Sequence, residues 1–254
     1  MQIVTWNVNS VRARLERVLA WIDRVQPDLV CLQELKCQHD QFPAEGFVAR
    51  GYQAVVNGQK TYNGVAILSR GPLEDPAPVR LLEDDDAARV VTTTVGGIRL
   101  VDVYVPNGKS VDSDSYVYKL RWIDALDAWL RANHSPDQPL VLCGDFNIAP
   151  DDRDVWDPAA WHEQVLCSTP ERERYQRLLS WGLHDALRHF TSEPAQYTWW
   201  DYRNLSFQKR MGLRIDHFLV TAPVLARAKG VRIDREERKG QGASDHAPVI
   251  LEIA

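Results

Sequence analysis

Apolar residues occur along the chain in two patterns, short continuous runs and longer stretches in which they recur at helical spacing. Residues 3–6 and 28–33 are short apolar runs of the kind that form buried strands. Between them the apolar residues recur every three or four positions, which places them on one helical face: Val11, Leu15, Val18, Leu19 and Ile22. We therefore predict a helix that begins near Ser10, a good N-cap residue, and ends before Pro27.

The remaining chain alternates strands and helices irregularly. Further strands are predicted at residues 52–56, 65–69, 90–95, 98–105, 140–143, 214–220, 224–233 and 249–253, and helices near residues 116–131 and 171–181. Gly96 and Gly97 between two strands indicate a hairpin, whereas other strands are separated by whole helices. Hairpins and crossovers together predict mixed sheets covered by helices, an α/β (α+β) fold. No linker or repeat interrupts this pattern, so residues 1–254 are predicted to form a single domain.

The composition restricts the class of protein. The 254 residues are 44% hydrophobic and 26% charged, which is typical of a globular protein and excludes disordered, collagen-like and membrane-spanning chains. No apolar run approaches the roughly 20 residues that cross a bilayer. The N-terminal residues look like a strand, without the basic region and long apolar stretch of a signal peptide. We therefore expect the protein to work in the cytosol and not at a membrane.

The distribution of charge matters more than the net charge. A net charge of −5 taken alone argues weakly against a nucleic-acid partner, since phosphate-binding proteins are usually basic. The acidic residues are clustered, however, at residues 83–86 and 151–157. Residues 199–214 reverse the balance with a local charge of +3, from Arg203, Lys209, Arg210 and Arg214 against Asp201. An anionic partner is therefore not excluded.

The four cysteines suggest no metal centre. Cys31, Cys37, Cys143 and Cys167 form no Cys-x-x-Cys pair, which argues against a structural zinc site. Cys31 and Cys143 lie inside apolar runs and are predicted to be small buried hydrophobic residues.

Polar side chains stand where the predicted strands end or begin. Such residues occur at six strand ends: Asn7, Glu34, Tyr104, Asn107, Asp145, Asn147, Asp216, Asp245 and His246. Each alone is typical of a turn, because Asn and Asp side chains bond to nearby backbone. Glu34, however, has no special role in turns, and functional sites in α/β sheets collect at strand ends. The whole set therefore predicts a site at one edge of the sheets.

The residue types in this set indicate the chemistry. Asn7, Glu34, Asp145 and Asp245 offer oxygen ligands and no thiolate, which suits Mg²⁺ or Mn²⁺. A carboxylate such as that of Asp216 can fix the tautomer of a histidine such as His246. Metal-assisted hydrolysis of a phosphate ester is the reaction class that this set supports best.

Five motifs in these regions resemble the exonuclease III family of DNA-repair nucleases, which belongs to the endonuclease/exonuclease/phosphatase superfamily. They run in the family's order from residue 5 to residue 248: Thr5-Trp6-Asn7-Val8-Asn9, Leu32-Gln33-Glu34-Leu35-Lys36, Gly144-Asp145-Phe146-Asn147-Ile148-Ala149-Pro150, Gly212-Leu213-Arg214-Ile215-Asp216 and Ser244-Asp245-His246-Ala247-Pro248. The resemblance implies a four-layered sandwich, in which two mixed β-sheets pack face to face between helices.

The resemblance also implies roles for the individual side chains. Glu34 would be the principal ligand of Mg²⁺, or of Mn²⁺, helped by Asn7 and Asp245. The implied catalytic residues are Asp145, which would activate the attacking water, Asn147, which would orient it, and Tyr104 and the His246–Asp216 pair, which would contact the phosphate. Whether Asp145 or His246 is the base stays open, as does the number of metal ions.

The implied substrate is double-stranded DNA with abasic sites, nicks or blocked 3′ ends, bound by a monomer. Residues implied to bind DNA are Arg89, Asn107, Lys109, Lys119, Trp199, Lys209, Arg210, Leu213 and Ile215. Of these, Trp199, Leu213 and Ile215 would line an apolar pocket for a base-less sugar, since extruding a nucleotide without its base costs less stacking energy. Trp199 could equally be a core residue. Residues 207–213 resemble a loop that wedges into the duplex, or form a solvated basic loop.

His162 stands in the acidic, Trp-rich segment after Asp145 and complicates the choice of substrate. If it lies over the mouth of the pocket, its ring would obstruct a flipped internal nucleotide and still admit a frayed 3′ terminus. We therefore predict that His162 biases the protein towards 3′-end processing, against the alternative of an ordinary surface histidine on a loop.

Two other functions stay open at this stage. One is a phosphatase of lipid or inositol phosphates from the same superfamily, which would share the metal site without needing Trp199 or the basic residues 199–214. The other is a non-catalytic binding protein on the same fold. The second alternative would be favoured by loss of any of five residues, all of which are present: Glu34, Asp145, Asn147, Asp216 and His246.

Overall fold

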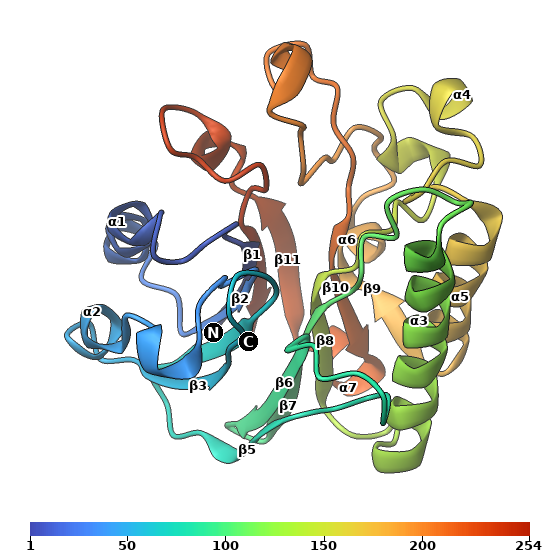
Figure 1. The fold of residues 1–254 in the computed structure, drawn as a ribbon. Coiled ribbons are helices and arrows are strands. Elements are labelled where there is room, and N and C mark those ends of the chain that lie inside the picture. The colour runs from blue at the N-terminus through green and yellow to red at the C-terminus, as the bar shows by residue number, and fades with distance from the viewer.

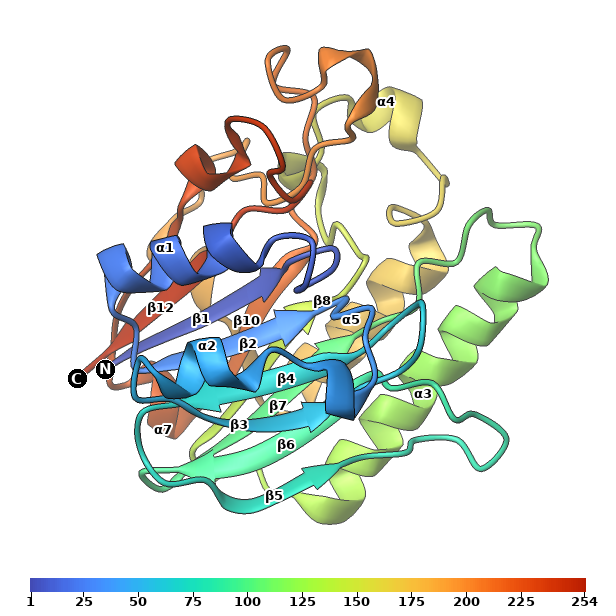
Figure 2. The same ribbon diagram turned by 60° about the vertical axis from the view of Figure 1, so that its left-hand side comes forward.

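The computed structural model describes residues 1–254 and contains two six-stranded sheets packed face to face, with helices on both outer faces (Figures 1 and 2). The four-layered sandwich agrees with the predicted fold class. No helix has both the length and the apolar character needed to cross a membrane.

The first sheet has the order β11-β12-β1-β2-β4-β3. Only β1 and β2 run parallel, joined through helix α1, and every other neighbouring pair is antiparallel. The strands are β1 (Gln2–Asn7), β2 (Leu29–Gln33), β3 (Gln53–Asn57), β4 (Val65–Ser69), β11 (Ala228–Ile233) and β12 (Val249–Ile253).

The second sheet has the order β5-β6-β7-β8-β10-β9, again with a single parallel pair, β7 and β8. Helix α3 forms the crossover between these two strands. The strands are β5 (Glu74–Pro78), β6 (Val90–Val95), β7 (Ile98–Tyr104), β8 (Leu140–Asp145), β9 (Leu183–Asp185) and β10 (Asp216–Thr221).

Three apolar layers hold the sandwich together. The inner faces of the two sheets meet in a buried cluster that includes Cys31 and Cys143, which are small buried residues as predicted. Helices α1 (Leu15–Val25) and α2 (Ala44–Val48) pack on the first sheet, and α3 (Asp114–Asn133) and α5 (Thr169–Ser180) on the second (Figure 1). Short helical turns lie in the loops: η1 (His39–Gln41), η2 (Asp152–Asp154), α4 (Pro158–Trp161), α6 (Ala186–Phe190), η3 (Arg203–Leu205), α7 (Ala222–Leu225) and η4 (Arg235–Arg238).

The predicted elements differ from the observed ones in two places. Helix α1 begins at Leu15 and not near Ser10, because Asn9 and Ser10 have φ angles of 45° and 90° and the Ser10 N–H donates to the Glu34 carbonyl. The predicted strand 224–233 is a short helix, α7, followed by β11. The short elements β5, β9, α2 and α4 were not predicted, since three to five residues carry too little periodicity.

The topology brings the predicted strand ends to one edge of the sandwich. Strands β1, β2, β7 and β8 end there, and β10 and β12 begin there because they run antiparallel to β8 and β1. Asp216 thereby lies opposite Asp145 in the register of β10 and β8. The loops that carry α4, η3 and η4 rise together above this edge in both views (Figures 1 and 2).

Gly144 shows how closely the backbone is packed at this edge. Its φ of +140° is unfavourable for other residues, and a Cβ atom added there would lie 1.9 Å from the Val103 carbonyl oxygen. The chain can therefore pass from Cys143 to Asp145 alongside β7 only with glycine at this position.

We predict that Gly144→Ala destabilises the protein by about 3 kcal/mol or more, since the clash is with backbone and the conformation is strained. Urea unfolding followed by circular dichroism measures this loss. Gly230→Ala in β11 is the matched control, because an added Cβ there meets nothing within 4 Å and should change stability little. Equal stability of the two variants would contradict the prediction.

Candidate active site

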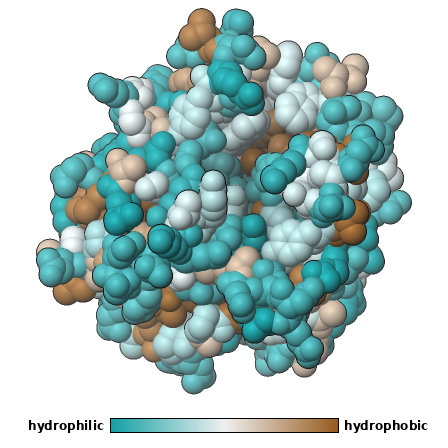
Figure 3. Space-filling model, viewed as in Figure 1, coloured by the Kyte–Doolittle hydropathy of each residue, from teal (hydrophilic) through white to brown (hydrophobic).

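A pocket of about 290 Å³ opens at the edge where the two sheets meet. Nine residues singled out from the sequence line it: Glu34, Tyr104, Asn107, Asp145, Asn147, Trp199, Ile215, Asp245 and His246. Five others were not predicted: Trp161, Val165, Leu166, Asp201 and Arg203. The space-filling view shows this face of the molecule hollowed in its upper half, with hydrophobic surface on part of the inner wall (Figure 3).

Asn7 joins the two carboxylates at the floor of the pocket. Its Nδ2 donates to Glu34 Oε1 at 2.8 Å and to Asp145 Oδ2 at 2.9 Å, so it bridges the first sheet to the second. Its Oδ1 accepts the backbone N–H of Asn9 at 3.0 Å. The side chain thereby positions Glu34 and Asp145, and its role as a metal ligand stays a prediction.

His246 is held between two aspartates. Its Nδ1 lies 2.9 Å from Asp216 Oδ2, and its Nε2 lies 3.8 Å from Asp145 Oδ2. Burial by itself lowers the pKa of His246, but the charges of Asp216 and Asp145 outweigh burial and raise the pKa to about 10. Burial raises the pKa of Asp145 to about 7, against the opposing charge of His246. His246 is therefore an imidazolium at neutral pH, and Asp145 can exchange a proton there.

Asn147 and Asn107 extend this polar floor. Asn147, with a φ of 50°, directs Nδ2 to Asp145 Oδ2 at 3.2 Å and to the Val105 carbonyl at 3.0 Å. Its Oδ1 accepts from Asn107 Nδ2 at 2.9 Å, which orients both amides. Burial, together with the charges of Glu34 and Asp145, raises the pKa of Tyr104 well above its usual value. Tyr104 is thus a protonated phenol at neutral pH, with an O–H that can donate a hydrogen bond.

The other side of the pocket carries Asp245. Trp199 Nε1 donates to Asp245 Oδ2 and Asn9 Nδ2 donates to Asp245 Oδ1, each at 3.0 Å. Burial raises the pKa of Asp245, but the His246 charge and these two hydrogen bonds outweigh burial, and the pKa is lowered. Asp245 is therefore a carboxylate that is held in place on both oxygens.

The donor set fits a hard divalent cation. Glu34, Asp145 and His246 can bring ligand atoms within 4.8 Å of one another. A cation is already accommodated at Glu34, because Lys36 Nζ lies 2.9 Å from Oε2. Glu34 has a φ of 51° and Lys36 a φ of 53°, and this tight turn directs both side chains to the same side.

An apolar wall faces the carboxylates. It consists of Trp161, Val165, Leu166, Trp199 and Ile215. Leu213 was predicted to line this pocket, but its side chain is fully buried behind the wall, since Leu213 pairs with Trp199 through backbone hydrogen bonds. His162 is exposed beside Trp161, and Trp161 itself lines the pocket.

The cations predicted to bind DNA lie in three different settings. Arg89 and Lys109 line a neighbouring cavity of about 530 Å³ that shares Glu34, Tyr104 and Asn107 with the active-site pocket. Arg89 stacks on the Tyr104 ring with its guanidinium carbon 4.9 Å from the ring centroid. Lys209 and Arg210 are exposed, but they do not line the active-site pocket.

Lys119 requires a correction. Its side chain is completely buried, with Nζ 2.5 Å from Glu171 Oε1, so it cannot reach a DNA phosphate. The spacing of charged residues along α3 did not reveal this, because the burial depends on loops that pack over the helix.

The loop that carries η3 lies at the rim of the pocket. Asp201 pairs with Arg203 at 2.6 Å, and both line the pocket. Phe207, at the start of the predicted wedge 207–213, is buried against Trp200, whereas Leu205 at the tip of η3 is 63% exposed. If this loop contacts DNA, its apolar tip is therefore Leu205. The local charge of +3 was the sequence signal for this loop, but nothing marked Arg203 as a pocket residue.

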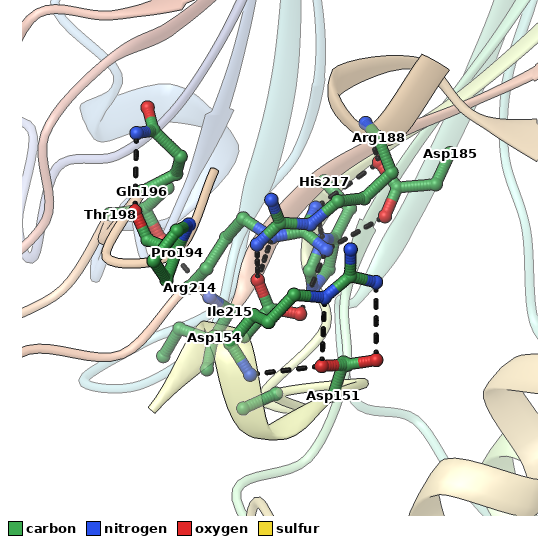
Figure 4. Close-up of polar contacts among 12 residues, drawn as sticks. Asp151, Asp154, Asp185, Arg188, Pro194, Gln196, Thr198, Arg214, Ile215 and His217 are labelled. Atoms are coloured by element: carbon green, nitrogen blue, oxygen red, sulfur yellow. Dashed lines mark hydrogen bonds and ion pairs between the residues drawn. The ribbon is translucent and has the colours of Figure 1, made fainter. Parts of the chain in front are cut away.

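A buried charge network lies behind the apolar wall (Figure 4). Arg214 donates to Asp154 at 2.6 and 3.0 Å and to Asp185 at 2.8 and 3.1 Å. Arg214 Nη1 also lies 3.0 Å from His217 Nδ1, and His217 Nε2 lies 2.8 Å from the Ile148 carbonyl. Because Nδ1 accepts from arginine, Nε2 donates to this carbonyl. The network therefore ties the segment after Asn147 to β10, which carries Asp216.

Comparisons with known proteins agree with this geometry. Residues 4–246 match the Endonuclease/Exonuclease/phosphatase family. Exodeoxyribonuclease III of Haemophilus influenzae is 32% identical to this chain, and the match covers 100% of both.

Two solved structures share the fold throughout. The Neisseria 3′ phosphatase NExo, solved with a product DNA hairpin, is 46% identical with a TM-score of 0.96, over 100% of this chain and 99% of that one. An AP endonuclease from Archaeoglobus fulgidus is 34% identical with a TM-score of 0.94, over 100% and 99% of the two chains.

The buried network generates a prediction about pH. Burial and the charge of Arg214 lower the pKa of His217 to about 4, below its ordinary value of 6.5. The unfolded chain therefore binds a proton that the folded chain refuses, and stability is lost as the pH falls from 6.5 towards 4. We predict that lowering the pH from 7 to 5 removes about 2 kcal/mol through His217 alone. Urea unfolding at pH 7 and pH 5 should show that His217→Gln loses about 2 kcal/mol less unfolding free energy than the wild type. An identical loss in both proteins would contradict the lowered pKa of His217.

Proposed function

The chain belongs to the endonuclease/exonuclease/phosphatase family, and we propose that it is a Mg²⁺-dependent phosphodiesterase that repairs DNA. The single observation that carries the proposal is the pocket in which Glu34, Asp145 and the His246–Asp216 pair face the apolar wall of Trp199 and Ile215. Carboxylates and an imidazolium suit a phosphate ester, and an apolar wall suits a sugar without its base. The substrates proposed are duplexes with abasic sites, nicks or blocked 3′ ends.

In the proposed mechanism, the chain's own residues bind the phosphate and move one proton. The His246 imidazolium, oriented by Asp216, donates to a phosphate oxygen and offsets the negative charge that develops in the transition state. We assign Asp145 as the base that takes the proton of the attacking water, since the two neighbouring aspartates favour a protonated His246. Asn147, whose Nδ2 donates to Asp145, orients this carboxylate and the water beside it, and Tyr104 donates a hydrogen bond to the phosphate or the leaving oxygen.

Mg²⁺ or Mn²⁺ would be held by Glu34 as principal ligand, helped by Asn7 and Asp245. When bound, the metal supplies charge that stabilises the pentacovalent phosphate and the leaving oxygen. Asn7 keeps Glu34 directed at this position.

The surroundings of the pocket support DNA as the substrate. Arg89 and Lys109 line a cavity continuous with the active-site pocket, and Lys209 and Arg210 are exposed beyond its rim. These cations would neutralise backbone phosphates and position the duplex without reading its sequence. All four cysteines are free and buried, which is consistent with a reducing compartment such as the cytosol. We expect a monomer, because a duplex must reach the open edge of the sandwich.

A lipid or inositol phosphatase remains the alternative function, but it has no use for the Trp199 wall. A non-catalytic binding protein would not need the preserved hydrogen-bond set around Asp145. Both alternatives are therefore tested by the substrates below.

We predict that Glu34→Gln lowers turnover at least about a thousandfold and abolishes Mn²⁺ binding with the fold intact, because the principal ligand charge is lost. Calorimetric titration with Mn²⁺ measures binding, and thermal unfolding reports the fold. Glu45→Gln on α2 is the control, since Glu45 is an exposed glutamate that does not line the active-site pocket. Retained Mn²⁺ binding and turnover in Glu34→Gln would exclude the proposed metal site.

The balance of activities is tested with two labelled duplexes in Mg²⁺, with Glu34→Gln as the blank. One duplex carries an internal abasic-site analogue and the other a nicked 3′ end bearing hydroxyl or phosphate. We predict preferential processing of the 3′ end, and a rise in abasic-site incision for His162→Gly, because the change removes an exposed side chain next to Trp161, which lines the pocket.

Unchanged incision in His162→Gly would show that this residue does not select the substrate. If neither duplex reacts, phosphorylated lipids are the next substrates to test.

A further inference from the structure

Lys119 is a fully buried lysine whose three N–H donors are all used. It lies on α3, and its Nζ donates to the carbonyl oxygen of Asn147 at 2.6 Å and to that of Asn107 at 3.1 Å. Its third partner is Glu171 Oε1 at 2.5 Å. Two of the three acceptors thus belong to the backbone of residues whose side-chain amides form the floor of the pocket.

Glu171 is equally buried and equally satisfied. It stands in the first turn of α5, where its Oε1 accepts the backbone N–H of Leu166 at 3.0 Å. Its Oε2 accepts both the backbone N–H and the hydroxyl of Ser168. Glu171 therefore holds the end of the loop that supplies Val165 and Leu166 to the apolar wall.

The stem of Lys119 completes the contact between these segments. A Cβ atom added at Gly108 would lie 3.1 Å from Lys119 Cδ and 3.1 Å from Val165 Cγ2, so the backbone at Gly108 is pressed between them. The Lys119–Glu171 ion pair consequently contacts three segments: the loop after β7, the turn after β8 and the loop before α5. Each of these three segments contributes lining residues to the active-site pocket.

We propose that the Lys119–Glu171 ion pair is a positioning unit that sets the apolar wall of Val165 and Leu166 against the catalytic amides of Asn107 and Asn147. The proposal rests on the proposed phosphodiesterase function for its effect on catalysis. Lys119 and Glu171 touch no substrate and act only through the residues they hold. Lys119 is then neither a DNA contact nor a general source of stability.

The pair suits this role for electrostatic reasons. The Asn147 carbonyl oxygen is buried against Lys119 Nζ and needs a donor there. A neutral hydroxyl donates one hydrogen bond and a neutral amide two, whereas an ammonium serves three acceptors in different segments. Hydrogen bonds to a charged group are also shorter and stronger than neutral ones, which holds the segments in fixed relative positions.

The kinetic test compares Lys119→Met, Glu171→Gln and the double variant on a duplex with a 3′ end, with turnover expressed per folded molecule. Each single change should lower kcat about ten- to a hundredfold and leave KM for DNA unchanged, since a displacement near 1 Å at the reacting groups costs that much. Because the two residues act as one unit, the double variant should lose about as much as one single variant and not the product of both.

The dependence of binding on salt separates positioning from a phosphate contact. A lysine that binds a DNA phosphate contributes about one to the slope of log K against log salt. Lys119→Met should leave this slope unchanged, whereas Lys109→Met, on the exposed neighbouring loop, should lower it by about one. A lower slope for Lys119→Met, or its unchanged kcat, would overturn the proposal.

Amide hydrogen exchange tests the same unit without any activity. In Glu171→Gln and in Lys119→Met alike, protection should fall together at residues 145–149 and 164–168 while β1 and β12 stay protected. Loss at only one of the two segments, or across the whole chain, would refute the coupling. If the wild-type protein does not act on DNA but the two variants still show the paired loss of protection, the proposed function is refuted and the positioning unit is retained.

Discussion

The whole site depends on one side chain that bridges the two sheets. Asn7 Nδ2 donates to Glu34 on the first sheet and to Asp145 on the second, and so holds together two carboxylates that would otherwise repel. The Asn7 side chain can make both bonds because the ends of β1, β2 and β8 lie side by side where the sheets pack. The relative position of the sheets, which is set by their apolar inner faces, therefore determines the separation of the catalytic groups.

The site gathers negative charge in a protein that is already acidic, and cations and donors offset it locally. Lys36 pairs with Glu34, and the His246 imidazolium lies between Asp216 and Asp145. A phosphate can approach this acidic pocket because a divalent cation and the imidazolium face it, while cations bind the backbone farther out. The net charge was therefore a poor guide to whether the protein binds an anionic partner, because it sums acidic and basic clusters that lie in different parts of the molecule.

Two buried sets of charges lie behind the pocket, Lys119 with Glu171 and Arg214 with Asp154 and Asp185. Buried ion pairs contribute little net stability, since the cost of desolvation offsets their attraction. Lys119 donates to the Asn147 carbonyl, and Glu171 accepts the backbone N–H of Leu166 in the apolar wall. Arg214 donates to His217, the residue after Asp216. Their common effect is to fix loops that have no sheet hydrogen bonds of their own.

The sequence by itself determined the strands, the main helices and the identity of nearly all polar pocket residues, because apolar periodicity and strand-end residues are local signals. Only the tertiary structure decided that Lys119 is buried, that the Asn7 amide faces carboxylates, and that Trp161 and Arg203 reach the pocket. The direction and burial of a side chain depend on segments far away in the chain. Nothing in the spacing of Lys119 along α3 distinguishes it from a surface residue. It is buried because Asn107, Asn147 and Glu171, which lie in other segments, contact its ammonium group.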